Sequence, residues 1–197
     1  MKLFGRYNRK MESHSVFPTP IASFSNFITE EERLELFKTI MKFKHVPHNA
    51  IIGSGGSTHT KNINFVDVKL KRRMQGAIDE YVNLYGCTPT NLDMLWSNVQ
   101  HSGSKLIEHT HPHCDLSGAL YINAKDFLYF HNPNPYVWCS DIAKHTDYNH
   151  EWFKIPVSNC LLLIFPSWLK HGKNDVVNTM DNRVVISFNA SRMRYVG

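Results

Sequence analysis

The spacing of apolar residues predicts two amphipathic helices in the first half of the chain. Thr29 and Glu32 have the separation of a capping box, in which each side chain bonds to the backbone amide of the other residue. A helix is therefore expected over residues 30–43. Apolar positions recur along it with helical period and predict one buried face. These positions are Leu34, Phe37, Ile40 and Met41.

The second helix is expected to start after Asp67 as the N-cap and to end at Gly86. Its predicted buried stripe consists of Leu70, Met74, Ala77, Ile78, Tyr81 and Tyr85. The basic residues Lys69, Lys71, Arg72 and Arg73 occupy the remaining surface, which favours a solvated face over a nucleic-acid site. Residues 53–56 (Gly-Ser-Gly-Gly) lack the Gly-Lys-Ser/Thr ending of a phosphate loop, so they predict a flexible connection or lid.

From residue 92 onward the pattern changes to short strands separated by turn signals. The expected strands are 92–99, 116–122, 127–130, 152–157, 160–165 and 183–188. Residues 157–160 and 178–182 resemble hairpin connections. Short strands at regular spacing predict a β-sandwich or barrel, here with the helices packed outside it.

Composition places the chain among soluble, intracellular proteins. Its 197 residues are enough for the core of one domain, and no apolar run approaches the ~20 residues of a membrane span. Residues 1–10 lack the apolar segment of a secretory signal. The four cysteines form no C-x-x-C pair, which indicates a reducing compartment. A net charge of +5 is mild, so a basic surface explains it better than nucleic-acid binding.

Histidine is unusually concentrated in one part of the chain. Eight of the 12 histidines lie between residues 101 and 171, where an even spread would place about four, and imidazole is the commonest metal ligand. Within this stretch His109 and His111 have the spacing that puts two side chains on one face of a strand. His111 with His113, and His113 with Asp115, have the same spacing. The spacing alone therefore predicts a metal site without choosing among these pairs.

A second chemical segment follows the strand that ends at Pro166. His171 stands five residues later, and Arg183 opens the last apolar strand twelve residues after His171. A hairpin joining the two strands would bring His171 and Arg183 into one interior. There an imidazole can bind a metal while a guanidinium binds a carboxylate bidentately.

The order of these motifs resembles the iron(II)- and 2-oxoglutarate-dependent oxygenases. More narrowly, several blocks are similar to the signature blocks of the 2-oxoglutarate/iron oxygenase family common in phage genomes. These blocks are residues 96–99, 109–112, 116–121, 130–133, 165–171 and 183–189, with 17–21 resembling that family's N-terminal opening. The resemblance covers most of the chain.

The resemblance implies a mainly β fold with flanking helices and a double-stranded β-helix core of the jelly-roll or cupin-like kind. One domain would span residues 1–197, with a helical N-terminal support region over 1–90 and the core over 91–197. By position, His109, His111 and His171 would bind the metal. Arg183 would bind the distal carboxylate of 2-oxoglutarate, with Tyr121 as its companion and Asn98 in the same cavity. The implied cofactors are iron(II), 2-oxoglutarate as cosubstrate and dioxygen.

Two departures from the family pattern stand out. Most of the superfamily has a carboxylate where His111 stands, and three neutral imidazoles leave iron(II) with its full +2 charge. The alternative first pair is His113 with Asp115, although Asp115 reads as a turn residue before the next strand. The second departure is Val185, where many relatives have a serine, so one possible hydroxyl contact to 2-oxoglutarate is missing.

The implied activity is hydroxylation of a substrate with release of succinate and carbon dioxide. Trp96, Phe130 and Trp168 are candidates to shape the cavity, and residues 136–152 to cover its opening. Alternative interpretations are a cupin-like metal enzyme that does not use 2-oxoglutarate, and a non-catalytic binding or structural module on an oxygenase fold. The sequence leaves the substrate open among a small molecule, a protein and a nucleic acid. It predicts a cytoplasmic location, in the host if the chain is phage-encoded, and no membrane partner.

Overall fold

A six-stranded antiparallel sheet is the centre of the fold in the computed structural model, which describes residues 18–59, 64–134, 143–146, 149–173 and 175–192. The sheet has the strand order β1-β9-β6-β10-β4-β3. Its strands are β1 (Ala22–Phe24), β3 (Gly55–Ser57), β4 (Thr90–Gln100), β6 (Leu116–Asn123), β9 (Leu162–Pro166) and β10 (Arg183–Arg192). The two helices are α1 (Glu30–Ile40) and α2 (Val68–Tyr85).

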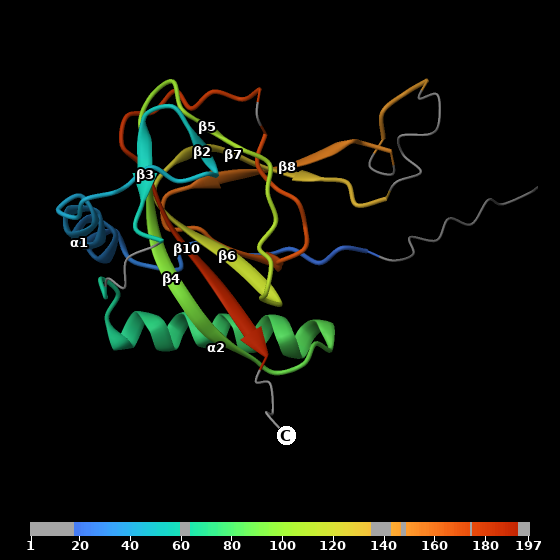
Figure 1. The fold of residues 1–197 in the computed structure, drawn as a ribbon. Coiled ribbons are helices and arrows are strands. Elements are labelled where there is room, and N and C mark those ends of the chain that lie inside the picture. The colour runs from blue at the N-terminus through green and yellow to red at the C-terminus, as the bar shows by residue number, and fades with distance from the viewer. Residues whose placement is uncertain (1–17, 60–63, 135–142, 147–148, 174, 193–197) are drawn as a thin grey trace, which may run out of the picture.

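Two small antiparallel sheets complete the architecture. One pairs β7 (Lys125–His131) with β8 (Trp152–Ser158), and the other pairs β2 (Ile51–Ile52) with β5 (Lys105–Leu106). Figure 1 shows α2 running across the large sheet on the side away from these small sheets. The prediction of a mainly β core with helices on its outside is therefore confirmed, and the fold is a double-stranded β-helix.

Alternation along β10 separates a helix-covered core from a cavity. Val184, Ile186 and Phe188 are fully buried in the apolar cluster that α1 and α2 cover. The intervening side chains face the opposite way and line a cavity, as the period of two in a strand requires. These cavity-lining residues of β10 are Arg183, Val185, Ser187 and Asn189.

The helix boundaries follow the predicted caps. The Thr29 hydroxyl accepts from the Glu32 amide and the Glu32 carboxylate accepts from the Thr29 amide, so the capping box is present. Asp67 caps α2, and Gly86 ends it in the left-handed region.

The predicted buried faces were partly wrong. Leu34 and Met41 of the expected first stripe are exposed, and Leu36 is buried beside Ile40 instead. Tyr85, which was assigned to the stripe of α2, is also exposed. Leu34 lies at the margin of the buried face of α1, where a small rotation of the helix decides which side chains contact the sheet. Met41 is the C-cap of α1 and Tyr85 is the last residue of α2, so both lie where a helix ends.

The two predicted hairpins are also wrong. Residues 157–160 connect β8 of a small sheet to β9 of the large sheet, and β9 and β10 are separated by β6. Residues 53–56 are not simply a lid, because Gly55–Ser57 forms β3 on the edge of β4. A side chain on Gly55 would meet the Val99 carbonyl at 2.5 Å, so only glycine allows this close pairing. β1 and β3 thus bring strands from the N-terminal region into the large sheet.

The close packing around Gly118 in β6 leads to a prediction about stability. A Cβ there would overlap the buried ring of Phe188 and lie 2.5 Å from the Leu163 carbonyl oxygen. Gly118→Ala is therefore expected to lower the free energy of unfolding by about 3 kcal/mol, the upper end for overpacking. Urea unfolding followed by circular dichroism measures it.

The matched control is Gly76→Ala on the exposed face of α2, where a Cβ meets nothing within 4 Å. That variant is expected to raise stability by about 0.5–1 kcal/mol through helix propensity. An unchanged stability of Gly118→Ala would contradict the packing described for β6.

Candidate metal centre and cosubstrate cavity

Two antiparallel segments bring His109, His111 and His171 together. His109 and His171 face each other in an isolated β-bridge, with both N–H···O=C hydrogen bonds at 3.0 Å. The amide of His111 donates to the Ser167 carbonyl at 2.9 Å, which continues the pairing. The backbone therefore fixes all three residues on two neighbouring stretches, one after β5 and one after β9.

The ring nitrogens of these histidines converge. One nitrogen from each ring lies within 4.8 Å of the other two, and the Nε2 atoms of His111 and His171 are 3.3 Å apart. Nδ1 of His109 is 2.7 Å from the Ile107 carbonyl, and Nδ1 of His171 is 3.0 Å from the Leu169 carbonyl. Since a carbonyl only accepts, each Nδ1 carries the proton, which leaves Nε2 with a free lone pair. The residues therefore fit a bound metal ion.

Burial keeps these imidazoles neutral. It lowers the pKa of His109, lowers the pKa of His111 to about 4 with help from neighbouring His109, and lowers the pKa of His171 well below its usual value. A metal binds the deprotonated ring, so no proton has to leave these side chains at neutral pH.

A cavity of about 820 Å³ extends from the three histidines to Arg183 and Tyr121. Tyr121 is 1% exposed, and the Arg183 guanidinium carbon lies 5.6 Å from the centre of its ring. Asn98, Tyr121 and Val185 stand side by side on β4, β6 and β10, because Val185 is the register partner of the other two. The Asn98 amide donates to the Ser187 hydroxyl at 2.9 Å. The predicted cosubstrate residues therefore share one cavity with the histidine group.

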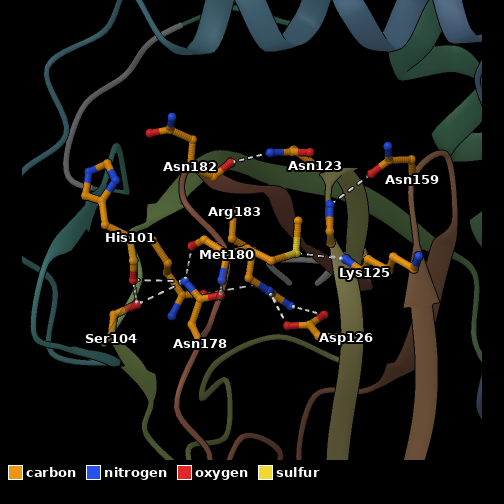
Figure 2. Close-up of polar contacts among 12 residues, drawn as sticks. His101, Ser104, Asn123, Lys125, Asp126, Asn159, Asn178, Met180, Asn182 and Arg183 are labelled. Carbon is orange, nitrogen blue, oxygen red and sulfur yellow. Dashed lines mark hydrogen bonds and ion pairs between the residues drawn. The ribbon is translucent and has the colours of Figure 1, made fainter.

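Arg183 is already engaged by the protein. Its Nε and Nη2 donate to the Asp126 carboxylate at 2.7 and 3.3 Å, and its Nη1 donates to the Gln100 side-chain oxygen at 3.0 Å. Figure 2 shows Asp126 reaching this guanidinium from β7, which belongs to a different sheet. A guanidinium has five N–H donors, so Asp126 and Gln100 leave two, and the Tyr121 side chain also hydrogen-bonds with Arg183 on the cavity wall.

The alternative metal pair lies apart from the histidine group. The Asp115 carboxylate accepts from the amide and Nε of Arg192 at 2.8 and 2.9 Å, and the His113 side chain is exposed. Asp115 also lies in the turn before β6, as its sequence position suggested.

Other predicted cavity residues separate into three groups. Trp96 lines the cavity, and Phe130 is buried with its ring centre 6.1 Å from that of His171. Trp168 is 54% exposed and lines a different cavity, so its assignment to the active cavity was wrong. Within the proposed cover 136–152, residues 136–142 and 147–148 lie outside the described residues.

Four contributors to the cavity region were not recognised in the sequence. Gln100 follows Trp96 and Asn98 at the same period of two, so the alternation of β4 contains a signal for it. Asp126 shares the inward side of β7 with buried Leu128 and Phe130, and a charged residue in such a row signals a buried partner. The histidines 48 and 59 also line the cavity, but they come from irregular segments without a pattern.

Residues 94–189 match the family model described as "Putative 2OG-Fe(II) oxygenase". HygX from Streptomyces hygroscopicus, solved with nickel and 2-oxoglutarate bound, is a similar structure at 12% identity and a TM-score of 0.63, covering 89% of this chain and 84% of that chain. The viral collagen prolyl hydroxylase of Paramecium bursaria Chlorella virus-1, solved with 2-oxoglutarate, is similar at 10% identity and a TM-score of 0.58, covering 88% and 96%. No curated protein matches the sequence significantly.

The fold is that of the double-stranded β-helix class, and its three converging histidines could hold a metal ion. The match of residues 94–189 to the 2-oxoglutarate/iron(II) oxygenase family model confirms the resemblance found in the sequence. The function is that of an iron(II)- and 2-oxoglutarate-dependent oxygenase, with iron(II), 2-oxoglutarate and dioxygen as cofactors. In the described part of the chain, neither helix is long and apolar enough to cross a membrane.

Proposed function

We propose that the chain is a hydroxylase in which His109, His111 and His171 hold iron(II) and Arg183 binds the distal carboxylate of 2-oxoglutarate. The observation that carries this proposal is the single cavity of about 820 Å³ that has the converging histidine nitrogens and Arg183 in its wall. In this arrangement both ends of the cosubstrate find a partner of the right chemistry.

Each residue has a defined task in this proposal. The backbone carbonyls of Ile107 and Leu169 hold the rings of His109 and His171 with Nε2 facing the metal position. Arg183 orients the cosubstrate, and Tyr121 beneath it excludes water from the carboxylate subsite. Iron(II) with 2-oxoglutarate and dioxygen supplies the oxidation that converts a substrate C–H bond into an alcohol and yields succinate and carbon dioxide.

The substrate-facing part of the cavity is lined by aromatic and imidazole rings. The rings of His48 and His59 are 5.3 Å apart, His59 lies edge-on to Trp96 at 4.7 Å, and Trp96 is 5.8 Å from His111. These rings continue outward from the proposed metal ligands and therefore form one wall for the substrate. The scattered cysteines support a cytoplasmic location for the enzyme, in a host cell if the chain is phage-encoded.

The test is succinate formation by the purified chain with iron(II), 2-oxoglutarate and oxygen. Slow succinate formation without added substrate is expected to require all three components, and omission of oxygen is the control. Iron(II) binding under anaerobic conditions with a stoichiometry near one per chain is expected in parallel. If the chain binds neither iron(II) nor 2-oxoglutarate, the non-catalytic module is favoured instead. Such a chain would also show no rise in melting temperature when metal is added.

The cupin-like alternative is separated by the cosubstrate. Such a metal enzyme would bind iron(II) through the same three histidines but would give Arg183 no carboxylate to hold. Saturable binding of 2-oxoglutarate that depends on Arg183 supports the proposed function, and metal binding without it supports the alternative.

A further inference from the structure

The guanidinium of Arg183 is held by two residues from different strands. The Asp126 carboxylate on β7 accepts hydrogen bonds from Nε and Nη2, and the Gln100 side-chain oxygen on β4 accepts one from Nη1. Gln100 is the register partner of Arg183 across the large sheet, whereas Asp126 belongs to a small sheet. Arg183 is 6% exposed, so this is a largely buried and nearly fixed guanidinium.

Asp126 approaches Arg183 from the side away from the main cavity. It lines a smaller cavity of about 90 Å³, which Arg183 and Gln100 also line, and it is not among the described residues that line the 820 Å³ cavity. The side chain of Asp126 is 33% exposed, against 7% for that of Arg183. The carboxylate of Asp126 therefore supports the guanidinium from behind and leaves its cavity side open.

The backbone before Asp126 is anchored at three points. The Ala124 amide donates to Asn159 Oδ1 at 2.9 Å, the Lys125 amide donates to Met180 Sδ at 3.2 Å, and the Asn123 side chain donates to the Asn182 carbonyl at 2.8 Å. Figure 2 shows these contacts around the Arg183–Asp126 pair. Asp126 thus stands on a fixed strand end, and it can hold Arg183 at a constant distance from the histidine group.

The charge of the pair determines how it recognises a ligand. An unpaired arginine attracts any anion, but the Arg183–Asp126 pair carries no net charge. Its attraction for a second carboxylate therefore depends on meeting the two remaining N–H donors in the right geometry. A ligand anchored at the metal meets them only if its chain has the right length.

We propose that Asp126 is a positioning residue which, through Arg183, sets the chain length of the 2-oxo dicarboxylate that the cavity accepts. The inference rests on the proposed function, since that function assigns the distal carboxylate of the cosubstrate to Arg183. Asp126 itself does not touch the cosubstrate; it fixes the place where the far carboxylate must end.

The experiment compares three 2-oxo dicarboxylates by anaerobic calorimetry on the iron(II)-loaded protein: oxaloacetate, 2-oxoglutarate and 2-oxoadipate. They differ by one methylene each and carry the same charge. Removing the negative charge of Asp126 therefore strengthens the electrostatic attraction of all three acids to nearly the same extent. This effect cancels when the dissociation constants of the acids are compared as ratios. The wild-type protein is expected to prefer 2-oxoglutarate by at least about tenfold over both others. Asp126→Ala is expected to reduce this preference to about twofold or less.

The matched control is Glu30→Ala, because Glu30 forms the same kind of bidentate pair with Arg33 on α1, outside the cavity. This control is expected to keep the wild-type preference. Asp126→Asn retains the shape and one acceptor oxygen, so its preference is expected between those of the wild type and the alanine variant. If Asp126→Ala fails to fold, the preference of Asp126→Asn tests the inference instead. Thermal unfolding of the iron-loaded variants shows whether each one folds.

A wild-type preference retained in the Asp126 variants would overturn the inference, and so would a wild-type protein that binds all three acids equally. Failure of the proposed function looks different, because then the wild-type protein binds none of the three acids at the iron centre. A loss of preference in Asp126→Ala with iron affinity unchanged supports the positioning role, since a general disruption of the fold would weaken iron binding as well.

Discussion

His171→Ala is expected to abolish succinate formation and to weaken iron(II) binding by at least about a hundredfold. His171 is 5% exposed, and its Nε2 lies 3.3 Å from that of His111, so no other side chain can replace it at this point. In the proposed ligand set only two imidazoles would remain, and a water molecule at the vacated position would not restore the affinity that a side chain held in place by the backbone contributes. Anaerobic metal titration and a succinate assay measure the two effects.

The controls for this variant also decide between the two ligand sets. His113→Ala removes a histidine of the alternative pair and is expected to bind iron(II) like the wild-type protein, as is His145→Ala in an exposed segment. Iron stabilises the wild-type fold in proportion to its affinity, so the upward shift of the melting temperature on adding metal should vanish only in His171→Ala. Loss of iron in His113→Ala would instead assign the site to His113 and Asp115.

Local signals in the sequence predicted the element boundaries well. The caps at Thr29 and Asp67 and the stop at Gly86 depend on nearest neighbours only, and all three are present. The strand expected over 183–188 was likewise found, as the first part of β10. Where the prediction depended on which face of α1 meets the sheet, as for Leu34, it was wrong, because that choice is made by tertiary packing.

Strand pairing was beyond the local signals. The turn residues of 157–160 and 178–182 predicted hairpins. The first segment instead connects strands of two different sheets, and the second precedes β10, which is separated from β9 by β6. His171 and Arg183 nevertheless share a cavity, because both β9 and β10 flank β6. The same limit applies to Asp126: its place on the inward side of β7 signals a buried partner, but the identity of that partner, 57 residues away on another sheet, depends on strand pairing.

In the proposed function, the net charge of the loaded cavity connects the three-histidine ligand set with Asp126. A site with two histidines and one carboxylate gives iron(II) a net charge of +1, which an unpaired arginine and the dianion 2-oxoglutarate bring to zero. Three neutral histidines leave the metal at +2. The additional negative charge here comes from Asp126 beside Arg183, so the loaded site is again neutral. The negative charge that a carboxylate ligand would supply at the metal would thus be supplied by Asp126 at the other end of the cosubstrate.

Arg183→Ala is expected to raise the dissociation constant of 2-oxoglutarate by about a hundredfold or more while iron(II) binding remains as in the wild-type protein. The two N–H donors of Arg183 that Asp126 and Gln100 leave would each form a charge-assisted hydrogen bond with the distal carboxylate, and such bonds contribute about 1.5–3 kcal/mol each. Arg183→Lys keeps the charge but cannot form both bonds, so it is expected between the alanine variant and the wild type. Anaerobic calorimetry on the iron-loaded proteins measures all three.

A ligand control separates loss of the carboxylate contact from damage to the cavity. 2-Oxopentanoate carries the same 1-carboxylate and 2-keto groups as 2-oxoglutarate but has a methyl group in place of the distal carboxylate. Its affinity is expected to be equal in the wild-type protein and in Arg183→Ala, because it offers Arg183 no acceptor. The Asp126 carboxylate, freed in this variant, is 33% exposed and can be solvated, so it need not disturb the metal end. Equal weakening of both ligands in Arg183→Ala would mean that Arg183 maintains the cavity rather than binding the cosubstrate.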